Sequence, residues 1–166
     1  MKRVLLPVAI IALIATSCGG EKNEKTEKTE EKTEVEVVSN VPDTVKLVLG
    51  ATDQMTYDKA EFEVKVGQTV SLTLKHKGTM PIESMGHNFV LLEMGTKVQD
   101  FAMEAQEARE NEYIPESNAI IAHTKLIGGG GETTIVFDAP GVGIYDYICT
   151  FPGHYGKMQG VLKVSR

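Results

Sequence analysis

EFEVKVGQTVSLTL, residues 61–74, alternates apolar and polar residues on both sides of a Gly-Gln pair. The apolar positions are Phe62, Val64, Val66, Val70, Leu72 and Leu74. Alternation of this kind is typical of β-strands that bury one face, so the stretch predicts two strands. Gly67 and Gln68 predict the turn between them.

Further short apolar runs continue the strand pattern along the chain, at residues 44–49, 87–92, 132–138, 143–149 and 160–164. Turn residues such as Gly, Pro and Asp separate many of them. Roughly seven or eight short strands with turns between them predict an all-β sandwich.

One segment breaks the strand pattern. Residues 98–113 are rich in Ala, Glu, Met and Gln, and Phe101, Ala105 and Ala108 lie at helical spacing. We therefore expect one helix inserted in the sandwich, ending before Pro115.

The first residues have the composition of an export signal. Lys2 and Arg3 precede an apolar run from Val4 to Ala15, which is too short to span a bilayer because a transmembrane helix needs about 20 residues. Small residues then lead into Cys18, as in the lipobox of bacterial lipoproteins, where the cysteine is lipidated. We expect a signal peptide at residues 1–17 and a lipid anchor on Cys18. The alternative is an ordinary cleaved signal with Cys18 as an incidental neighbour.

A charged, repetitive segment follows Cys18. It contains the run EKNEKTEKTEEKTE and has no apolar residue before Val35, so it cannot build a core of its own. We expect residues 18–40 to be a flexible tether and residues 41–166 to be the folded domain.

The charge and cysteine content limit the possible partners and bonds. The formal net charge is −6, which argues against nucleic acid because its binders need a basic surface. A negative surface could steer the chain towards a basic protein, or it could simply keep the chain soluble. The chain has two cysteines, Cys18 and Cys149. They could form a disulfide in an exported protein, but lipidation would consume the Cys18 thiol.

The candidate functional residues lie around the second cysteine. Residues 149–158, CTFPGHYGKM, have the spacing Cys-x4-His-x3-Met between two expected strands, and Gly86-His87-Asn88 opens an earlier strand. Soft sulfur ligands suit Cu(I), imidazole suits both oxidation states, and a His2Cys plane with a weak axial Met is the ligand set of blue-copper sites. A Met thioether is a poor zinc ligand. We predict one copper ion bound by His87, Cys149, His154 and Met158.

These motifs resemble those of azurin, a family of bacterial blue-copper cupredoxins. The matching segments are residues 53–55 (DQM), 85–88 (MGHN), 121–128 (IAHTKLIG), 136–138 (VFD) and 149–154 (CTFPGH). The resemblance covers the whole expected domain and implies an eight-stranded Greek-key cupredoxin sandwich with one inserted helix. It also implies three equatorial ligands, an axial methionine and a distant axial carbonyl: His87, Cys149, His154, Met158 and Gly86.

The resemblance further assigns roles to the neighbours of the ligands. The backbone N–H groups of Asn88 and Phe151 are implied to point at the Cys149 sulfur. The Asn88 side chain is implied to tie the two ligand loops together through Thr150; a local turn hydrogen bond is the alternative. A docking patch near His154 is implied at Met55, Met85, Pro152, Gly153, Tyr155 and Lys157, of which the last two depart from the family pattern.

The remaining histidines outside the ligand set are not expected to bind copper. His123 is implied to lie on the surface. His76 matches a partly buried histidine beside the site, which either shifts the reduction potential with pH or is structural.

We therefore predict a one-electron carrier, tethered to a membrane through Cys18 in the bacterial cell envelope, either facing the periplasm or at the outer membrane. The expected partners are redox proteins, such as a c-type cytochrome or a copper-containing reductase, and not nucleic acid or a small-molecule substrate. The alternative is a copper-binding or delivery module for copper tolerance, which would exchange its metal quickly. An enzyme is not expected, because copper oxidases and nitrite reductases need a further copper and more histidines than the four present. Nothing in the sequence indicates a binding module that acts on other proteins or cells.

Overall fold

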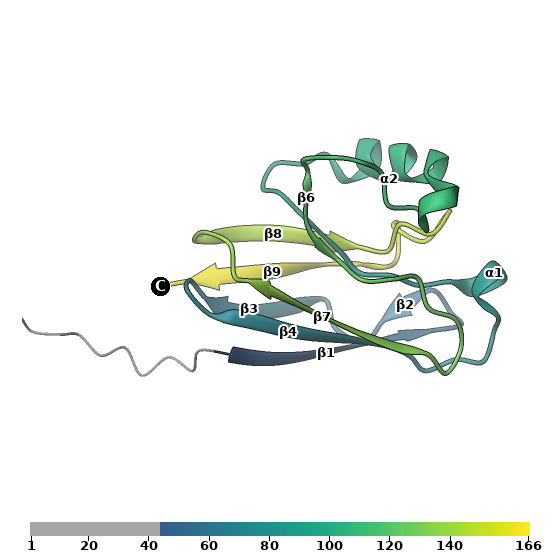
Figure 1. Ribbon diagram of the computed structural model, residues 1–166, viewed down its shortest axis with the longest axis horizontal. Coiled ribbons are helices and arrows are strands. Elements are labelled where there is room, and N and C mark those ends of the chain that lie inside the picture. The colour runs from purple at the N-terminus through teal and green to yellow at the C-terminus, as the bar shows by residue number, and fades with distance from the viewer. Residues whose placement is uncertain (1–43) are drawn as a thin grey trace, which may run out of the picture. The chain divides into compact units, whose positions relative to one another are not determined.

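Two β-sheets pack face to face in residues 44–166, the part of the chain that the computed structural model describes (Figure 1). The first sheet has the strand order β2-β1-β4-β7 and the second has the order β3-β9-β8-β5-β6. The first sheet consists of β1 (Thr44–Thr52), β2 (Thr56–Tyr57), β4 (Thr69–His76) and β7 (Glu132–Asp138). The second consists of β3 (Glu61–Lys65), β5 (Val90–Leu92), β6 (Ile120–His123), β8 (Gly143–Ile148) and β9 (Gln159–Ser165). The predicted all-β sandwich is confirmed: besides the two-residue β2, eight strands form the sheets within this range.

The stretch at residues 61–74 connects the two sheets. β3 belongs to the second sheet and β4 to the first, so the turn between them crosses from one layer to the other. Gly67 adopts a φ of 85° in this turn, a left-handed conformation that glycine tolerates. The backbone N–H of Lys65 donates to Oε1 of Gln68 at 2.7 Å, which closes the turn.

The alternation predicted the burial of one residue in this stretch wrongly. Phe62 and Val64 are buried as predicted, but Val66 is 46% exposed. β3 ends at Lys65, and the N–H of Val66 donates to the carbonyl of Ser165 at the start of the turn. The face shared by Phe62 and Val64 therefore does not continue to Val66.

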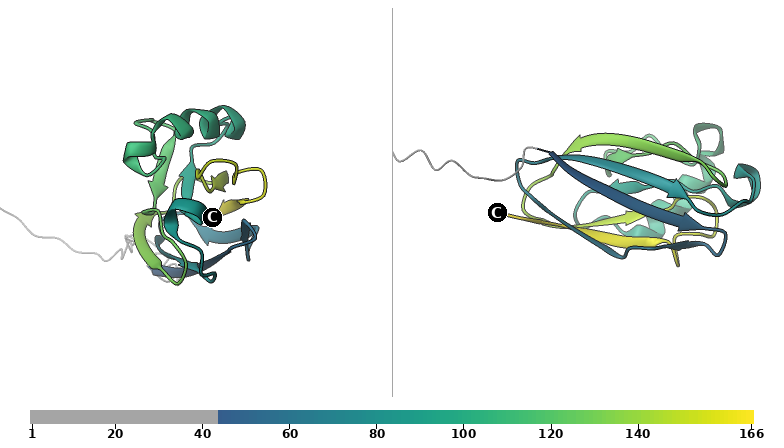
Figure 2. Two further views of the ribbon diagram at one scale, coloured as in Figure 1. Left: turned by 90° about the vertical axis from the view of Figure 1, so that its right-hand side faces the viewer. Right: turned by 90° about the horizontal axis from the view of Figure 1, so that it is seen from below.

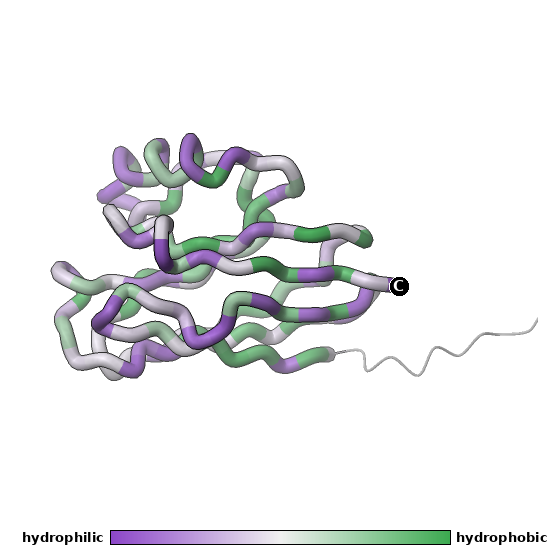
Figure 3. The backbone as a smooth tube through the Cα atoms, turned by 180° about the vertical axis from the view of Figure 1, so that it is seen from behind, coloured by the Kyte–Doolittle hydropathy of each residue, from purple (hydrophilic) through white to green (hydrophobic). Residues whose placement is uncertain are grey.

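β4 is a central strand of the first sheet. It pairs in parallel with β1 and antiparallel with β7. Its residues Val70, Leu72 and Leu74 are fully buried, and each such side chain contributes about 1.5–3 kcal/mol through burial. Figure 3 shows the corresponding alternation of hydrophobic and hydrophilic positions along the strands.

Helix α2 (Val98–Glu107) covers part of the second sheet on the side away from the first (Figure 1). Its buried residues Phe101, Ala102 and Ala105 lie on one face, and the first two form a second hydrophobic cluster with Val90, Leu92, Ile114 and Ile148. The inserted helix is confirmed, but its predicted end at residue 113 is wrong.

The chain leaves the α-helical path after Glu107. The N–H of Ala108 donates to Ala105, three residues back, and a 3-10 turn follows at Arg109–Asn111. Glu112 and Tyr113 then adopt positive φ values of 55° and 63°. This turn allows Ile114 to enter the second cluster, where it is buried.

The expected strand at residues 87–92 begins only at Val90. His87 instead forms an isolated bridge with Ile127, with reciprocal N–H···O contacts of 2.9 Å. β6, which we did not predict as a strand, pairs with β5 beside this bridge. The IAHTKLIG run therefore flanks the segment that carries His87.

The candidate ligand segments meet at one end of the sandwich. The loop between β8 and β9 and the short helix α1 (Ile82–Met85) lie at the end opposite the start of β1 and the last residue of the chain (Figure 1). Figure 2 (left) looks onto this end. Within residues 44–166 there is no helix long and apolar enough to cross a membrane. The predictions for residues 1–40, including Cys18, lie outside the described residues.

Candidate metal centre

Cys149 and His154 lie on the loop that connects β8 to β9. Cys149 directly follows the last residue of β8 and is fully buried. Its N–H donates to the Met158 carbonyl at 2.9 Å, so the two residues lie opposite each other where the loop leaves the sheet. Within the loop, the N–H groups of His154 and Met158 donate to Phe151 and His154 at 3.0 and 2.9 Å. Gly153 has a φ of 81°, which lets the chain turn tightly before His154.

His87 reaches the same place from the other ligand segment. It follows Gly86, whose position leaves no room for a side chain: a Cβ there would lie 2.7 Å from the Ile82 carbonyl oxygen and 2.9 Å from Leu126. The glycine therefore allows helix α1 and Leu126 to pack closely against the segment that carries His87.

Three potential ligand atoms converge in the interior. Cys149 Sγ lies 3.6 Å from Nδ1 of His154 and 4.0 Å from Nδ1 of His87. All three atoms lie within 4.8 Å of one another, and all three residues are buried. Sγ also lies 3.9 Å from the Gly86 carbonyl oxygen. One thiol and two imidazoles, with a carbonyl nearby, form a donor set that suits copper.

The orientation of His87 is fixed by a backbone group. Its Nε2 lies 2.9 Å from the carbonyl oxygen of Thr52. A carbonyl can only accept, so Nε2 carries the hydrogen and the lone pair of Nδ1 faces Cys149. Ligating histidines commonly have such a partner on the second ring nitrogen.

Burial sets the protonation of the three groups. It lowers the pKa of His87 and of His154 to about 4, which keeps both imidazoles neutral and able to bind a metal. It raises the pKa of Cys149 to about 12, although the backbone N–H groups of Asn88 and Phe151 oppose this rise. A cation in the site would displace the thiol proton and compensate the thiolate charge. The residues therefore fit a copper ion.

Met158 also lies in this region of the core. It is fully buried and belongs to the same hydrophobic cluster as Cys149. The Met158 thioether is thus shielded from water on the same loop as Cys149 and His154.

The Asn88 side chain joins the two ligand segments. Its Oδ1 accepts from the N–H of Thr150 at 2.9 Å, and its Nδ2 donates to Oγ1 of Thr150 at 2.8 Å. The backbone N–H groups of Asn88 and Phe151 act on the Cys149 thiol, because both lower its pKa against the effect of burial. The tie through Thr150 and both N–H donors are therefore present.

Three supporting residues were missed by the sequence reasoning. The Tyr57 hydroxyl donates to the carbonyl of Asn88. The carbonyl of Glu112 accepts from Asn88 Nδ2 at 3.3 Å. Thr124, within the IAHTKLIG run, accepts from the N–H of Phe89 at 2.9 Å. Thr124 lies in the IAHTKLIG run, whose match to azurins could have indicated a role for it. Nothing in the local sequence indicated a role for Tyr57 or Glu112.

The residues of the docking patch differ in exposure. Pro152, Gly153 and Lys157 are exposed, whereas Met55 and Met85 are partly buried. Tyr155 is also partly buried and packs against the second hydrophobic cluster, beside α2. The Tyr155 ring is thus partly engaged in packing within the domain.

The other two histidines have different environments. His123 is exposed, and its nearest polar contact is the carbonyl of Thr124. His76 is buried and stacks on His87, with ring centroids 4.4 Å apart. Its Nδ1 accepts from the N–H of Gly78 and its Nε2 donates to the Met85 carbonyl. Both His76 nitrogens thus have polar partners within the domain.

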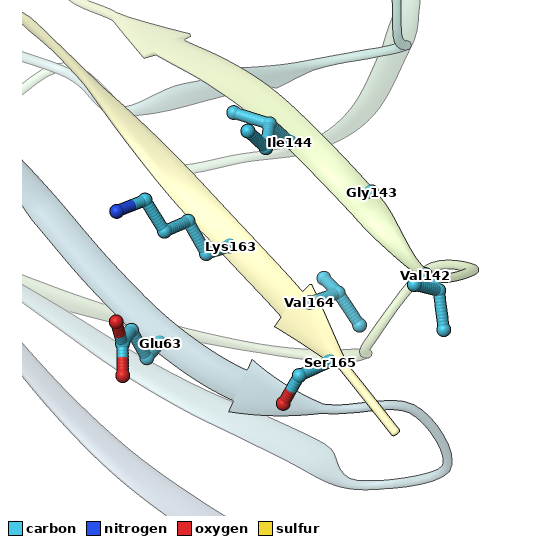
Figure 4. Close-up of a pocket in the computed structure, with 7 residues that line it drawn as sticks. All are labelled: Glu63, Val142, Gly143, Ile144, Lys163, Val164 and Ser165. Atoms are coloured by element: carbon cyan, nitrogen blue, oxygen red, sulfur yellow. The ribbon is translucent and has the colours of Figure 1, made fainter.

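Two surface pockets are lined by none of the three residues that supply the converging ligand atoms. Figure 4 shows one on β3, β8 and β9, with Glu63, Lys163 and Ile144 on the strands and Val142 at the turn before β8. It contains neither a histidine nor a cysteine. The other is lined by Phe151, α1 and the turn at Arg109 to Tyr113. Neither offers a comparable donor set.

Comparison with known proteins identifies the family. Residues 44–165 match the family of copper binding proteins described as the plastocyanin/azurin family. The chain is 37% identical over 126 residues to the azurin of Pseudomonas fluorescens biotype C, covering 72% of this chain and 98% of that protein. It is also 37% identical over 117 residues to the outer membrane protein H.8 of Neisseria gonorrhoeae, covering 66% of this chain and 62% of that protein.

The solved structures agree with this assignment. The crystal structure of dithionite-reduced auracyanin from Roseiflexus castenholzii is 35% identical and superimposes with a TM-score of 0.67, covering 76% of this chain and 99% of auracyanin. The cupredoxin sandwich, the copper cofactor and electron transfer rather than enzymatic catalysis follow from this relationship. The chain belongs to the plastocyanin/azurin family of copper-binding electron carriers.

Proposed function

We propose that the chain is a one-electron carrier with a mononuclear type 1 copper site formed by His87, Cys149, His154 and Met158, with the Gly86 carbonyl as a weak further contact. The observation that carries the proposal is the convergence of one thiol and two imidazole nitrogens within 4.8 Å in the buried interior. Copper bound there would alternate between Cu(I) and Cu(II), because this ligand set serves both oxidation states.

The protein matrix supports electron transfer by holding the ligands still. The His87 imidazole is oriented by the Thr52 carbonyl, and the Cys149 loop is tied to the His87 segment through Asn88. Little rearrangement is then needed when the charge of the metal changes. All four side chains are buried, so the site offers no open position for a substrate.

The docking patch is the proposed exit for the electron. His154 is 3% exposed, and its neighbours Pro152, Gly153 and Lys157 are exposed on the same loop. Its partners are redox proteins; we propose a c-type cytochrome or a copper-containing reductase. Lys157 adds a positive charge beside this surface, which favours a partner with acidic groups at its own docking site.

The proposed location is the bacterial cell envelope. We propose a signal peptide at residues 1–17, a lipid anchor at Cys18, a tether at residues 18–40 and the copper domain at residues 41–166. The similarity to a protein named outer membrane protein H.8 supports an envelope location.

Single substitutions in the full chain test the ligand set. Cys149→Ser should abolish the intense blue colour after Cu(II) is added, because the thiolate is lost. Met158→Leu should keep a blue site with an altered reduction potential, because the axial ligand is weak. His123→Gln, at an exposed histidine, is the matched control and should match the wild type. A blue Cys149→Ser protein would disprove the assignment.

Metal exchange separates electron transfer from copper delivery. An electron carrier should retain its copper through repeated reduction and oxidation in the presence of a chelator such as EDTA. Rapid loss of the metal during the first cycles would favour a delivery module instead.

A further inference from the structure

Tyr57 contacts the metal centre without belonging to the ligand set. It is the second residue of β2, and its hydroxyl donates to the backbone carbonyl of Asn88. Asn88 is fully buried, so this carbonyl is shielded from water. The phenol therefore satisfies a buried polar group that would otherwise carry a cost.

The other polar groups of Asn88 bind the ligand loop and, through Nδ2, also the Glu112 carbonyl. The Asn88 side chain exchanges two hydrogen bonds with Thr150, at 2.9 and 2.8 Å. Its backbone N–H is directed at the Cys149 sulfur. The Asn88 carbonyl, which accepts from the Tyr57 hydroxyl, thus links Asn88 to β2 of the first sheet.

The hairpin that carries Tyr57 also holds the adjacent ligand. β1 and β2 pair antiparallel, with Ala51 opposite Tyr57. The carbonyl of Thr52, in the same hairpin, accepts from the His87 imidazole at 2.9 Å. Two neighbouring residues of the ligand segment are therefore fixed by one hairpin.

The ring and the hydroxyl of Tyr57 have separable effects. The ring packs against Tyr147, with centroids 5.9 Å apart, a contact that phenylalanine would keep. The hydroxyl adds only the hydrogen bond to Asn88. Without it, the backbone around Asn88 is less restrained, and its N–H can turn away from the sulfur.

We propose that Tyr57 is a positioning residue of the copper site: its hydroxyl fixes Asn88 so that the Asn88 N–H stays directed at the Cys149 sulfur. This inference rests on the proposed function. Hydrogen bonds to a ligating sulfur tune the reduction potential of its metal. N–H donors withdraw charge from the thiolate and disfavour Cu(II), so loss of the Tyr57 hydroxyl should lower the potential.

Two variants of the full chain test the proposal, Tyr57→Phe and Tyr147→Phe. Tyr147 is fully buried in the same aromatic cluster, and its hydroxyl donates to the Lys59 carbonyl at 2.8 Å. The control therefore loses a comparable hydrogen bond that does not involve Asn88. The measurements are the reduction potential of the copper-loaded protein and the hydrogen exchange rate of the Asn88 amide in the metal-free protein.

Tyr57→Phe should lower the reduction potential and speed exchange at Asn88 by about tenfold, the effect of losing one hydrogen bond. Tyr147→Phe should leave both values as in the wild type, even if its melting temperature falls equally. Unchanged values in Tyr57→Phe, or equal changes in both variants, would overturn the positioning role. If the wild type forms no one-electron copper centre, the proposed function fails, while exchange in the metal-free protein still tests the role of Tyr57.

Discussion

Burial sets the protonation state of the three buried ligand residues: it keeps the two imidazoles in the neutral form that binds a metal, but it keeps the thiol protonated. Removal from water disfavours the charged forms, so the pKa values of His87 and His154 fall to about 4 and that of Cys149 rises to about 12. The imidazoles are ready to bind, whereas the thiol must lose its proton to a cation. Copper binding should therefore release a proton from Cys149.

The stability of the metal-free protein should fall as the pH is lowered from about 6.5 to about 4. In this window the unfolded chain binds protons at His87 and His154 that the folded protein does not bind. Each histidine costs up to about 3 kcal/mol across the window, with no further loss from these groups below it. Urea denaturation at a series of pH values measures the effect.

A variant and its matched control test whether His154 contributes to this pH dependence of stability. His154→Leu should remove roughly half of the loss of unfolding free energy, if both histidines contribute equally. His123→Gln, at an exposed position, should leave the profile unchanged. An identical slope in His154→Leu and wild type would contradict the assignment.

Asn88→Ala should destabilise the domain and weaken the link between the ligand segments. The change removes both hydrogen bonds to Thr150 and leaves buried groups unpaired, at a cost of about 2–4 kcal/mol. Chemical denaturation of the metal-free protein measures it. Asn118→Ala, at an exposed asparagine, should change stability by less than about 0.5 kcal/mol. Equal losses of stability in Asn88→Ala and Asn118→Ala would show that the hydrogen bonds between Asn88 and Thr150 do not stabilise the domain.

At the scale of secondary structure, strands with regular alternation could be predicted, but segments shaped by the site could not. β4 follows the alternation because one face packs on the core along its whole length. The run from His87 lacks the expected strand geometry because its first residues turn towards Cys149 and bridge Ile127. Local periodicity does not report a contact between residues so distant in sequence.

The helix illustrates the same limit. Ala-rich and Glu-rich residues predicted helix up to residue 113, but α2 ends at Glu107. Burial of Ile114 and the contact of the Glu112 carbonyl with Asn88 require the turn that follows. These tertiary interactions override helical propensity. The ligand loop could be recognised because its chemical groups lie within ten residues. His87 could be added because it completes the donor set for copper, but the local sequence did not show how the two segments meet.

Phe101→Ala should destabilise the domain without changing the copper site. Phe101 packs in the second cluster with Val90 and Leu92, and its truncation should cost about 3–5 kcal/mol. Met103→Ala, on the same helix but 58% exposed, should cost less than about 0.5 kcal/mol. Denaturation measures stability, and the absorption spectrum of the copper-loaded proteins reports the site. A changed spectrum in Phe101→Ala would show that α2 shapes the ligand set.

At the scale of the whole molecule, the ligand segments meet at the end of the sandwich opposite the start of β1 (Figure 1). A tether that precedes β1 would thus join the domain at the end away from the copper. This arrangement leaves the docking patch clear of the point of attachment. It agrees with the proposed role as a tethered carrier.

Cys18→Ser should change the membrane association of the chain but not its copper site. Cys149→Ser should change the copper site but not the membrane association. Loss of Cys18 should move the chain from the membrane fraction to the soluble fraction of bacterial cells while the purified protein still turns blue with copper. Loss of Cys149 should abolish the colour and leave the chain in the membrane fraction. Cell fractionation with labelled palmitate measures anchoring. A Cys18→Ser chain that stays labelled and membrane-bound would contradict the anchor.

The central claim is that one buried copper ion carries one electron. A reductive titration of the copper-loaded full chain, followed by the blue absorption band and by metal analysis, tests it most directly. We expect one copper per chain and complete, reversible bleaching after one electron equivalent. A colourless complex, or bleaching that requires more than one electron per chain, would contradict it.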